Sequence, residues 1–311
     1  MSRARYPDEQ GHVVNDGVRI FYELYGEYEP TVLLMPPVAF SYSRIWKFQV
    51  PYLSRHFRVV TFDGRGNGQS DRPSQPRAYA VDQHVADALA VMDRTETKHA
   101  IVAVLGPRAI CAVRLAIDHP DRVAGLALLA PDLFSDREFA DAWRAAPPAP
   151  HVGFGAFNPH LMRSDWPQFL DEWSRVMFPH RHSSRQIEDM IAYGLETDGE
   201  TFIASTVGMR YPPRDVVIEL ARLLPCPCVV TQWDVPMWPA RTSDVFAHAA
   251  KAPLVVFEGL GPQVAIRWPV ALNLLLREFA ESIRDGREPN YERWNQPDRP
   301  QAPVKSTSAT A

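Results

Sequence analysis

The sequence predicts an α/β fold in which a mostly parallel, twisted sheet carries helices on both faces and receives a helical cap insertion. Three observations support this prediction. Short apolar runs typical of buried strands alternate with segments of helical spacing between residues 31 and 129. The same alternation resumes between residues 216 and 283. The intervening stretch, residues 132–214, is rich in Trp, Phe, His and Pro and shows no strand alternation. Strands that alternate with helices favour a parallel sheet covered on both faces.

The elements follow in order along the chain. An Asn-Asp-Gly turn at residues 15–17 predicts an N-terminal hairpin. Strands are expected at residues 13–14, 18–25, 31–35, 58–62, 100–105, 123–129, 228–231 and 254–257. Helices are expected at residues 45–55, 79–94, 108–118, 216–224, 241–250 and 269–283. The predicted organisation is a core of residues 1–131 and 215–285, a cap of residues 132–214, and a disordered, polar and Pro-rich tail of residues 286–311.

Composition and charge exclude several classes of protein. The 311 residues are 46% hydrophobic and 23% charged, which is ordinary for a globular chain. The net charge of -4 provides no field to attract nucleic acid or an anionic membrane. No apolar run of about 20 residues is present to span a membrane. The N-terminus shows no signal peptide, and the three cysteines form neither a disulfide framework nor a metal site. We therefore expect a cytoplasmic protein without metal or cofactor.

Two short motifs resemble those of the α/β-hydrolase family. Residues 62–70, FDGRGNGQS, resemble its D-x-R-G-x-G-x-S turn, and residues 119–123, HPDRV, resemble its H-P-E-R-V step. The resemblance extends over most of residues 11–283 and implies the family's fold. It also implies a nucleophile elbow, in which a Ser stands on a tight strand-to-helix turn.

The elbow implied by this resemblance lacks a nucleophile. Counted back from the H-P step, it falls on residues 104–108 and places Gly106 at the nucleophile position. A register two residues later places Arg108 there, and neither residue can attack a carbonyl. Pro107 follows Gly106 and has no N–H to donate to an oxyanion. In the second oxyanion loop Pro37 lacks an N–H as well, so that only Val38 remains as a donor there.

The base position of the resembled triad is also changed, whereas the acid is retained. Pro262 stands at the base position, and no His follows His248. Asp234 matches the acid and has two open roles: a cap of the following turn, or a free carboxylate in the site. Together the resemblance predicts a set of substrate-binding positions: Pro37, Val38, Gly106, Pro107, Arg108, Trp233, Asp234 and Trp238.

A few further residues remain as candidates for chemistry. Cys111 would be a displaced nucleophile, although its place on the helix after the elbow favours a core position. Arg108 either points toward a ligand or is solvated. The histidines of the cap either pack or transfer protons, and these are His151, His160, His180 and His182.

The combined losses favour a protein that does not hydrolyse. The leading hypothesis is a cyclisation, dehydration or other rearrangement of a small apolar or amphipathic molecule, without a covalent acyl-enzyme. One alternative is an inactive pseudo-hydrolase that acts as a binding or scaffold protein. Another is a hydrolase with displaced catalytic residues. The sequence leaves open whether the protein is a homodimer.

Overall fold

A computed structural model describes residues 4–37, 40–133, 153–179, 182–233, 242–257 and 263–291. Its centre is an eight-stranded sheet in the order β1-β2-β4-β3-β5-β6-β7-β8. β1 and β2 form an antiparallel hairpin, β2 pairs antiparallel with β4, and the remaining pairs are parallel. The strands are β1 Glu9–Asn15, β2 Val18–Tyr25, β3 Thr31–Leu34, β4 Arg58–Phe62, β5 Ala100–Leu105, β6 Val123–Leu129, β7 Cys228–Trp233 and β8 Leu254–Phe257. The predicted fold class is confirmed.

The central strands consist mostly of apolar residues because both of their faces are covered. Every residue of β3 and of β5 is buried, as expected of parallel strands between two helical layers. The register pairs Leu34 with Ala103, and Leu105 with Leu129. β5 and β6 therefore end level with each other, and the turns that follow them lie at the same edge of the sheet.

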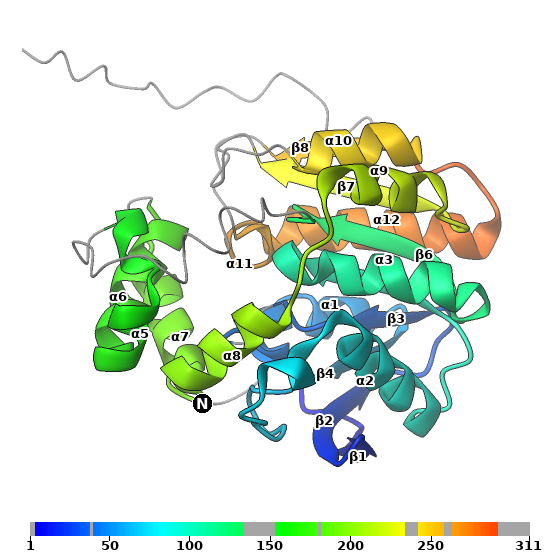
Figure 1. The fold of residues 1–311 in the computed structure, drawn as a ribbon. Helices are drawn as coiled ribbons and strands as arrows, with labels where there is room; N and C mark the ends of the chain where they lie inside the picture. The colour runs from blue at the N-terminus through cyan, green and yellow to red at the C-terminus, as the bar shows by residue number, and fades with distance from the viewer. Residues whose placement is uncertain are drawn as a thin grey trace, which may run out of the picture.

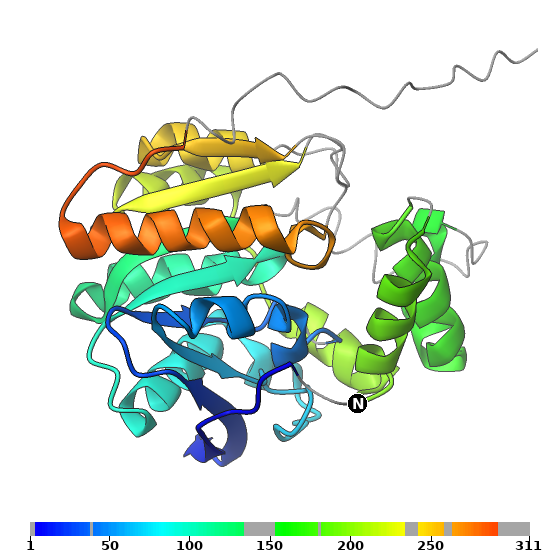
Figure 2. The same cartoon turned by 180° about the vertical axis from the view of Figure 1, so that it is seen from behind.

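Helices cover both faces of the sheet (Figures 1 and 2). One face carries α2 Val81–Arg94, α3 Ala109–Asp118, α9 Arg214–Arg222 and α10 Thr242–Ala250. The other carries α1 Val50–Leu53, α11 Val264–Arg267 and α12 Pro269–Asp285. The single helix expected at residues 45–55 is wrong. A 3-10 turn at Ser43–Trp46 precedes α1, because Pro51 lacks an N–H and fits only the first turn of a new helix.

Between β6 and α9, the described residues form four α-helices that lie beyond the carboxyl ends of the parallel strands. The arrowheads of β6 and β7 point toward them in Figure 1. These cap helices are α5 Pro159–Ser164, α6 Trp166–Met177, α7 Ser184–Gly194 and α8 Gly199–Gly208. Aromatic contacts join them to the core, where Phe40 lies 5.1 Å from Phe202 and 6.4 Å from Phe169 between ring centroids. These cap aromatics are buried and pack against one another.

Polar contacts fix the cap helices to the core. Tyr42 Oη donates to Glu196 at 2.7 Å, and Thr197 Oγ1 donates to the carbonyl of Gly66 at 2.7 Å. Lys47 also pairs with the buried Asp189 of α7. Gly66 lies in the glycine-rich turn after β4 and has a φ of 90°. Through its carbonyl this turn binds the segment that precedes α8.

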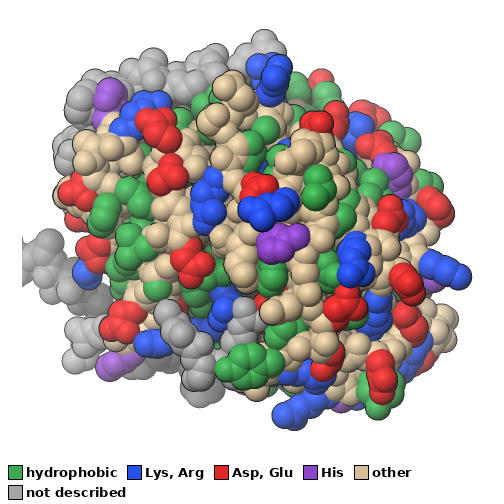
Figure 3. All heavy atoms as spheres, turned by 90° about the horizontal axis from the view of Figure 1, so that it is seen from below, with side chains coloured by type: hydrophobic (Ala, Val, Ile, Leu, Met, Phe, Trp, Pro, Cys, Tyr) green, Lys and Arg blue, Asp and Glu red, His purple; other side chains and the backbone are tan. Residues whose placement is uncertain are grey.

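The predicted boundaries between core, cap and tail remain a prediction. Within the described residues the chain stays packed past residue 286, because Gly286 ends α12 in the left-handed conformation and Tyr291 is buried. No helix of the described ranges is both long and apolar enough to cross a membrane. On the face shown in Figure 3, acidic and basic side chains are interspersed, consistent with the absence of a single-sign field.

Candidate active site

The turn after β5 has the backbone of an elbow but no side chain at its apex. β5 ends at Leu105, and Gly106–Arg108 form a 3-10 turn that leads into α3. Gly106 has a φ of 67°, a left-handed conformation that Gly adopts without strain. A Cβ built on Gly106 has no atom of the described residues within 4 Å. Among the described residues, nothing therefore occupies the position where a side chain would project from this turn.

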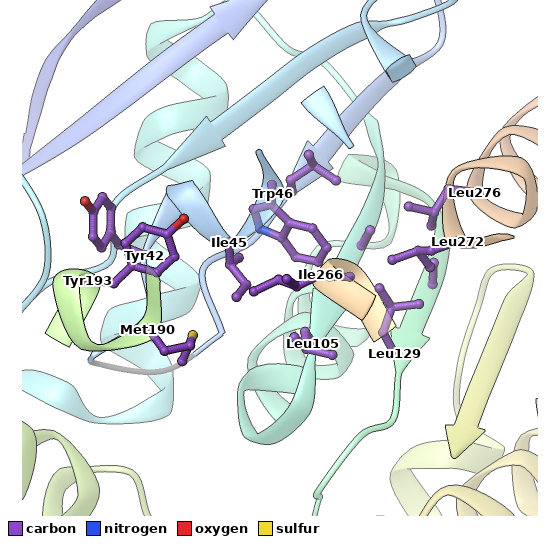
Figure 4. Close-up of a cluster of buried hydrophobic side chains, with 14 of the residues drawn as sticks. Tyr42, Ile45, Trp46, Leu105, Leu129, Met190, Tyr193, Ile266, Leu272 and Leu276 are labelled. Carbon is purple, nitrogen blue, oxygen red and sulfur yellow. The ribbon is translucent and has the colours of Figure 1, made fainter. Parts of the chain in front are cut away.

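Apolar side chains form the floor beneath this edge (Figure 4). Leu105 and Leu129, the last residues of β5 and β6, lie near Trp46 and Ile266 in one buried cluster. Trp46 Nε1 donates to the carbonyl of Met35 at 3.1 Å, which holds the chain after β3 in place. Pro37 is buried in this loop and has no N–H. The described part of the floor is thus apolar, and Pro37 offers it no N–H.

Arg108 lies behind the elbow and is neither solvated nor at the open edge. It is 4% exposed. Its guanidinium donates to Ser205 Oγ of α8 at 3.1 Å and contacts Nε2 of His84 on α2. Pro107, the residue before it, is partly buried and cannot supply the N–H that the elbow normally offers.

Asp132 is a site candidate that the sequence reasoning missed. It follows β6 by three residues, and its N–H donates to the carbonyl of Gly106 at 3.4 Å, so that it stands beside the elbow. The turn that places it contains Ala130 at a φ of 43°, an uncommon conformation for a residue with a Cβ. Two hydrogen bonds hold Ala130: its N–H reaches the carbonyl of Thr231 at 3.0 Å and Oγ1 of Thr231 at 3.2 Å. The sequence signal that could have identified Asp132 is an acidic residue shortly after the end of a buried parallel strand.

The Asp132 carboxyl is poised for proton transfer. Within the described ranges it makes no side-chain hydrogen bond or ion pair, and burial raises its pKa from 3.8 to about 6. The Tyr211 hydroxyl lies near enough for the Asp132 charge to add to the effect of burial in raising the Tyr211 pKa. At neutral pH the site therefore contains a carboxylate able to accept a proton and a phenol able to donate a hydrogen bond.

Two other groups do not fit a catalytic role. Burial raises the pKa of Cys111 to about 12, and its Sγ contacts Met209 Sδ at 3.9 Å in the core, so Cys111 is not a displaced nucleophile. Burial also raises the pKa of Asp63 to about 6, but its carboxylate accepts the N–H groups of Ser43 at 3.2 Å and Gln69 at 2.9 Å. Asp63 therefore stabilises the turn after β4.

Several predicted positions lie outside the described residues: Val38, Asp234, Trp238, Pro262, His151 and His180. Trp233 ends β7, and only its backbone is described. His160 and His182 are exposed. No group of three potential metal ligands occurs in the described part of the chain.

Comparisons with known proteins agree with this architecture. A family model described as "alpha/beta hydrolase fold" matches residues 31–151. A hydrolase from Pseudomonas aeruginosa PA01 superposes with a TM-score of 0.74 at 20% identity, over 88% of this chain and 98% of that one. The chain has the alpha/beta-hydrolase fold. An enol-lactonase from Burkholderia xenovorans LB400 shares this alpha/beta-hydrolase fold with a TM-score of 0.70 at 21% identity, over 86% of this chain and 99% of that one.

Relatives of higher identity cover shorter segments. The putative carbamate hydrolase RutD of Caulobacter segnis is 34% identical over 84 residues, 27% of this chain and 32% of that protein. Epoxide hydrolase B of Mycobacterium tuberculosis is 35% identical over 82 residues, 26% of this chain and 23% of that protein. This chain thus matches about a third or less of the length of these curated relatives.

These relatives contradict the non-hydrolytic function predicted from the sequence. The two curated relatives are named as hydrolases, one a putative carbamate hydrolase and the other an epoxide hydrolase. A cyclisation, dehydration or rearrangement is therefore the wrong conclusion. The error lay in equating the loss of a Ser nucleophile with the loss of hydrolysis, since water itself can attack once a general base removes its proton.

Proposed function

We propose that this protein is a hydrolase that adds water directly to the carbonyl carbon of a small ester or lactone, with Asp132 as the general base. The observation that carries the proposal is the carboxyl of Asp132, which has no partner among the described residues and stands beside an elbow whose apex is Gly106. The names of the similar hydrolases support the reaction class.

The reaction needs no covalent intermediate. The space that the described residues leave free at Gly106 would hold a water molecule where another elbow holds a hydroxyl. The Asp132 carboxylate takes a proton from this water as its oxygen attacks the carbonyl carbon, which gives a tetrahedral oxyanion and a protonated Asp132. When the intermediate collapses, the carbon–oxygen bond to the leaving alcohol breaks, and Asp132 returns its proton to that alcohol. The products are an acid and an alcohol, and the carboxylate is regenerated.

The oxyanion requires a hydrogen-bond donor that Pro107 cannot supply. The Tyr211 hydroxyl is suited to this role, because burial and the nearby Asp132 keep it protonated. In this scheme Gly106 and Pro262 stand where a nucleophile and a base would be in the resembled triad, and Asp132 takes over the proton transfer. The catalytic groups are thus displaced and reduced to one carboxylate and one phenol.

An isotope experiment tests the proposal. The purified protein is screened against short-chain esters, lactones, carbamates and epoxides, and an active substrate is then turned over once in H2(18)O. Direct attack by water places the label in the acid product of this first turnover. Asp132→Asn should lower kcat by roughly 100-fold or more, the usual scale for losing a general base. Asp121→Asn is the matched control, because Asp121 is an exposed acid just before β6, whereas Asp132 follows the other end of that strand.

Three results contradict the proposal. If the rate of hydrolysis is unchanged in the Asp132→Asn variant, Asp132 is not the general base. An acyl-enzyme trapped by acid quench during the first turnover, or an unlabelled acid product with the label on the protein, assigns a covalent nucleophile instead. Absence of turnover across the whole panel excludes hydrolysis of these substrate classes.

A further inference from the structure

A buried polar cluster lies behind the elbow, between the core and the cap helix α8. It consists of Tyr79, His84, Arg108 and Ser205, and none of these residues is more than 4% exposed. Arg108 connects its parts, because the guanidinium contacts His84 of α2 and donates to Ser205 of α8 at 3.1 Å. The rings of Tyr79 and His84 lie 6.4 Å apart between centroids. The cluster therefore spans three segments that are distant in the sequence.

The cluster carries an unbalanced positive charge. Within the described residues no carboxylate forms an ion pair with Arg108. Asp87 on α2 is already held by two 2.7 Å hydrogen bonds from Arg65 and one of 2.8 Å from Asn15. Burial and the two guanidinium groups hold the pKa of His84 well below 6.5, so its ring is neutral. Buried charges are as a rule paired, so this guanidinium, which faces only neutral acceptors, lacks a counter-ion among the described residues.

Two hydroxyl groups in the cluster have hydrogen atoms without an acceptor. Tyr79 is fully buried, and its Oη has no hydrogen-bond partner. Ser205 Oγ accepts from Arg108, and its own O–H has no acceptor among the described residues. Burial raises the pKa of Tyr79 to about 12, so its hydroxyl remains a donor at neutral pH. Unsatisfied buried donors are uncommon in folded proteins and call for an explanation.

We propose that a small monovalent anion, a halide or a carboxylate group, binds among Arg108, Ser205 and Tyr79. Such an anion accepts the N–H groups of Arg108 and both free O–H groups, and it neutralises the charge that burial makes costly. It also joins the first turn after β5 to α8, so it stabilises the docking of the cap helices. The site is distinct from the hydrolytic chemistry proposed above, because Arg108, Ser205 and Tyr79 take no part in the proton transfer assigned to Asp132.

Thermal unfolding of the full chain tests this site. Chloride, bromide or acetate replaces a bulky sulfonate at constant ionic strength, and Tm is followed against anion concentration. Specific binding gives a saturating rise in Tm, equivalent to about 1.4 kcal/mol at a roughly tenfold excess of anion over its Kd. Arg108→Met should abolish the response. Tyr79→Phe should weaken the apparent affinity about fivefold, the scale of one lost hydrogen bond. Arg114→Met is the control with unchanged response, because Arg114 pairs with Asp118 in an exposed pair on α3.

The outcomes separate the possible ligands. Saturation with chloride and bromide assigns a halide, and saturation with acetate alone assigns a carboxylate group. A response that does not saturate, or that persists in Arg108→Met, overturns the proposal. If Arg108→Met fails to fold, crystals of the unmodified protein grown in bromide decide the question. An anomalous peak within hydrogen-bonding distance of Arg108 and Tyr79 supports the site. Its absence overturns the halide assignment, and only a saturating rise in Tm with acetate would then support the site, with a carboxylate group as its ligand.

Discussion

Replacing Asp132 by Asn is expected to make the protein more stable at neutral pH while removing its activity. The ionised carboxylate lies in a turn where burial disfavours the charge and no described side chain compensates for it. Its pKa of about 6 lies roughly 2 units above the ordinary 3.8. At about 1.36 kcal/mol per unit, the charge costs up to about 3 kcal/mol, and partial exposure to solvent reduces this figure. Asn is close in volume and uncharged, so it should recover 1 to about 3 kcal/mol.

The pH dependence of this gain has a definite sign. The folded pKa of Asp132 lies above the unfolded value, so the folded state binds more protons between pH 3.8 and about 6. The unmodified protein therefore loses stability as pH rises through this window, and the Asn variant does not. The difference between them should be small below pH 3.8, grow through the window, and stay constant above about 6.

Urea unfolding on both sides of this window measures the effect. Asp63→Asn is the matched comparison, because burial raises the pKa of Asp63 to about 6 as well. Its carboxylate accepts two backbone N–H groups, so the amide would leave one of them unpaired and destabilise the turn. An Asp132→Asn variant that gains no stability, or gains equally at every pH, would refute the burial argument for Asp132.

Further predictions concern the same region. If Asp132 is the base, kcat/KM should rise with pH through about 6 and then level off. A pH profile of kcat/KM without this rise contradicts the role of Asp132 as the base. Gly106→Ser should slow hydrolysis, because the hydroxymethyl group would occupy the space assigned to the attacking water. Faster turnover of the same ester by this variant would contradict that assignment. Gly208→Ala should destabilise the protein by more than about 1 kcal/mol in thermal unfolding, because the new Cβ would lie 2.0 Å from the carbonyl oxygen of Pro76. The pKa of His84 lies well below 6.5, so stability should fall as pH drops below 6.5, and His84→Gln should flatten that slope in acid titrations followed by circular dichroism.

The strands were predictable because their burial leaves a direct trace in the sequence. β5 is six apolar residues buried on both sides, and the predicted bounds at residues 100–105 match it. The helix after β3 was predicted less well, since the 3.6-residue spacing continues across the break that Pro51 imposes. Periodicity reports which faces are buried, and it does not report where the backbone hydrogen bonds stop.

The site was less accessible from the sequence than the fold. The position of Gly106 follows from strand and helix lengths, which local patterns encode. The importance of Asp132 depends on a strained turn at Ala130 and on contacts with Thr231, about a hundred residues away. The partners of Arg108 likewise come from α2 and α8. Such long-range relations are properties of the folded chain, and no local residue pattern reveals them.

The cap helices are inserted between two strands that pair directly, Leu126–Leu129 of β6 with Cys228–Thr231 of β7. Closing a loop of this length has an entropic cost that grows only with the logarithm of its length, by about 0.6 kcal/mol per doubling. The strands from β1 to β6 already form a contiguous sheet before the insertion begins. A lengthened or shortened cap therefore changes the folding equilibrium of the sheet very little. The cap helices can therefore diverge in length during evolution while the sheet, and the rate at which its first six strands assemble, stay the same.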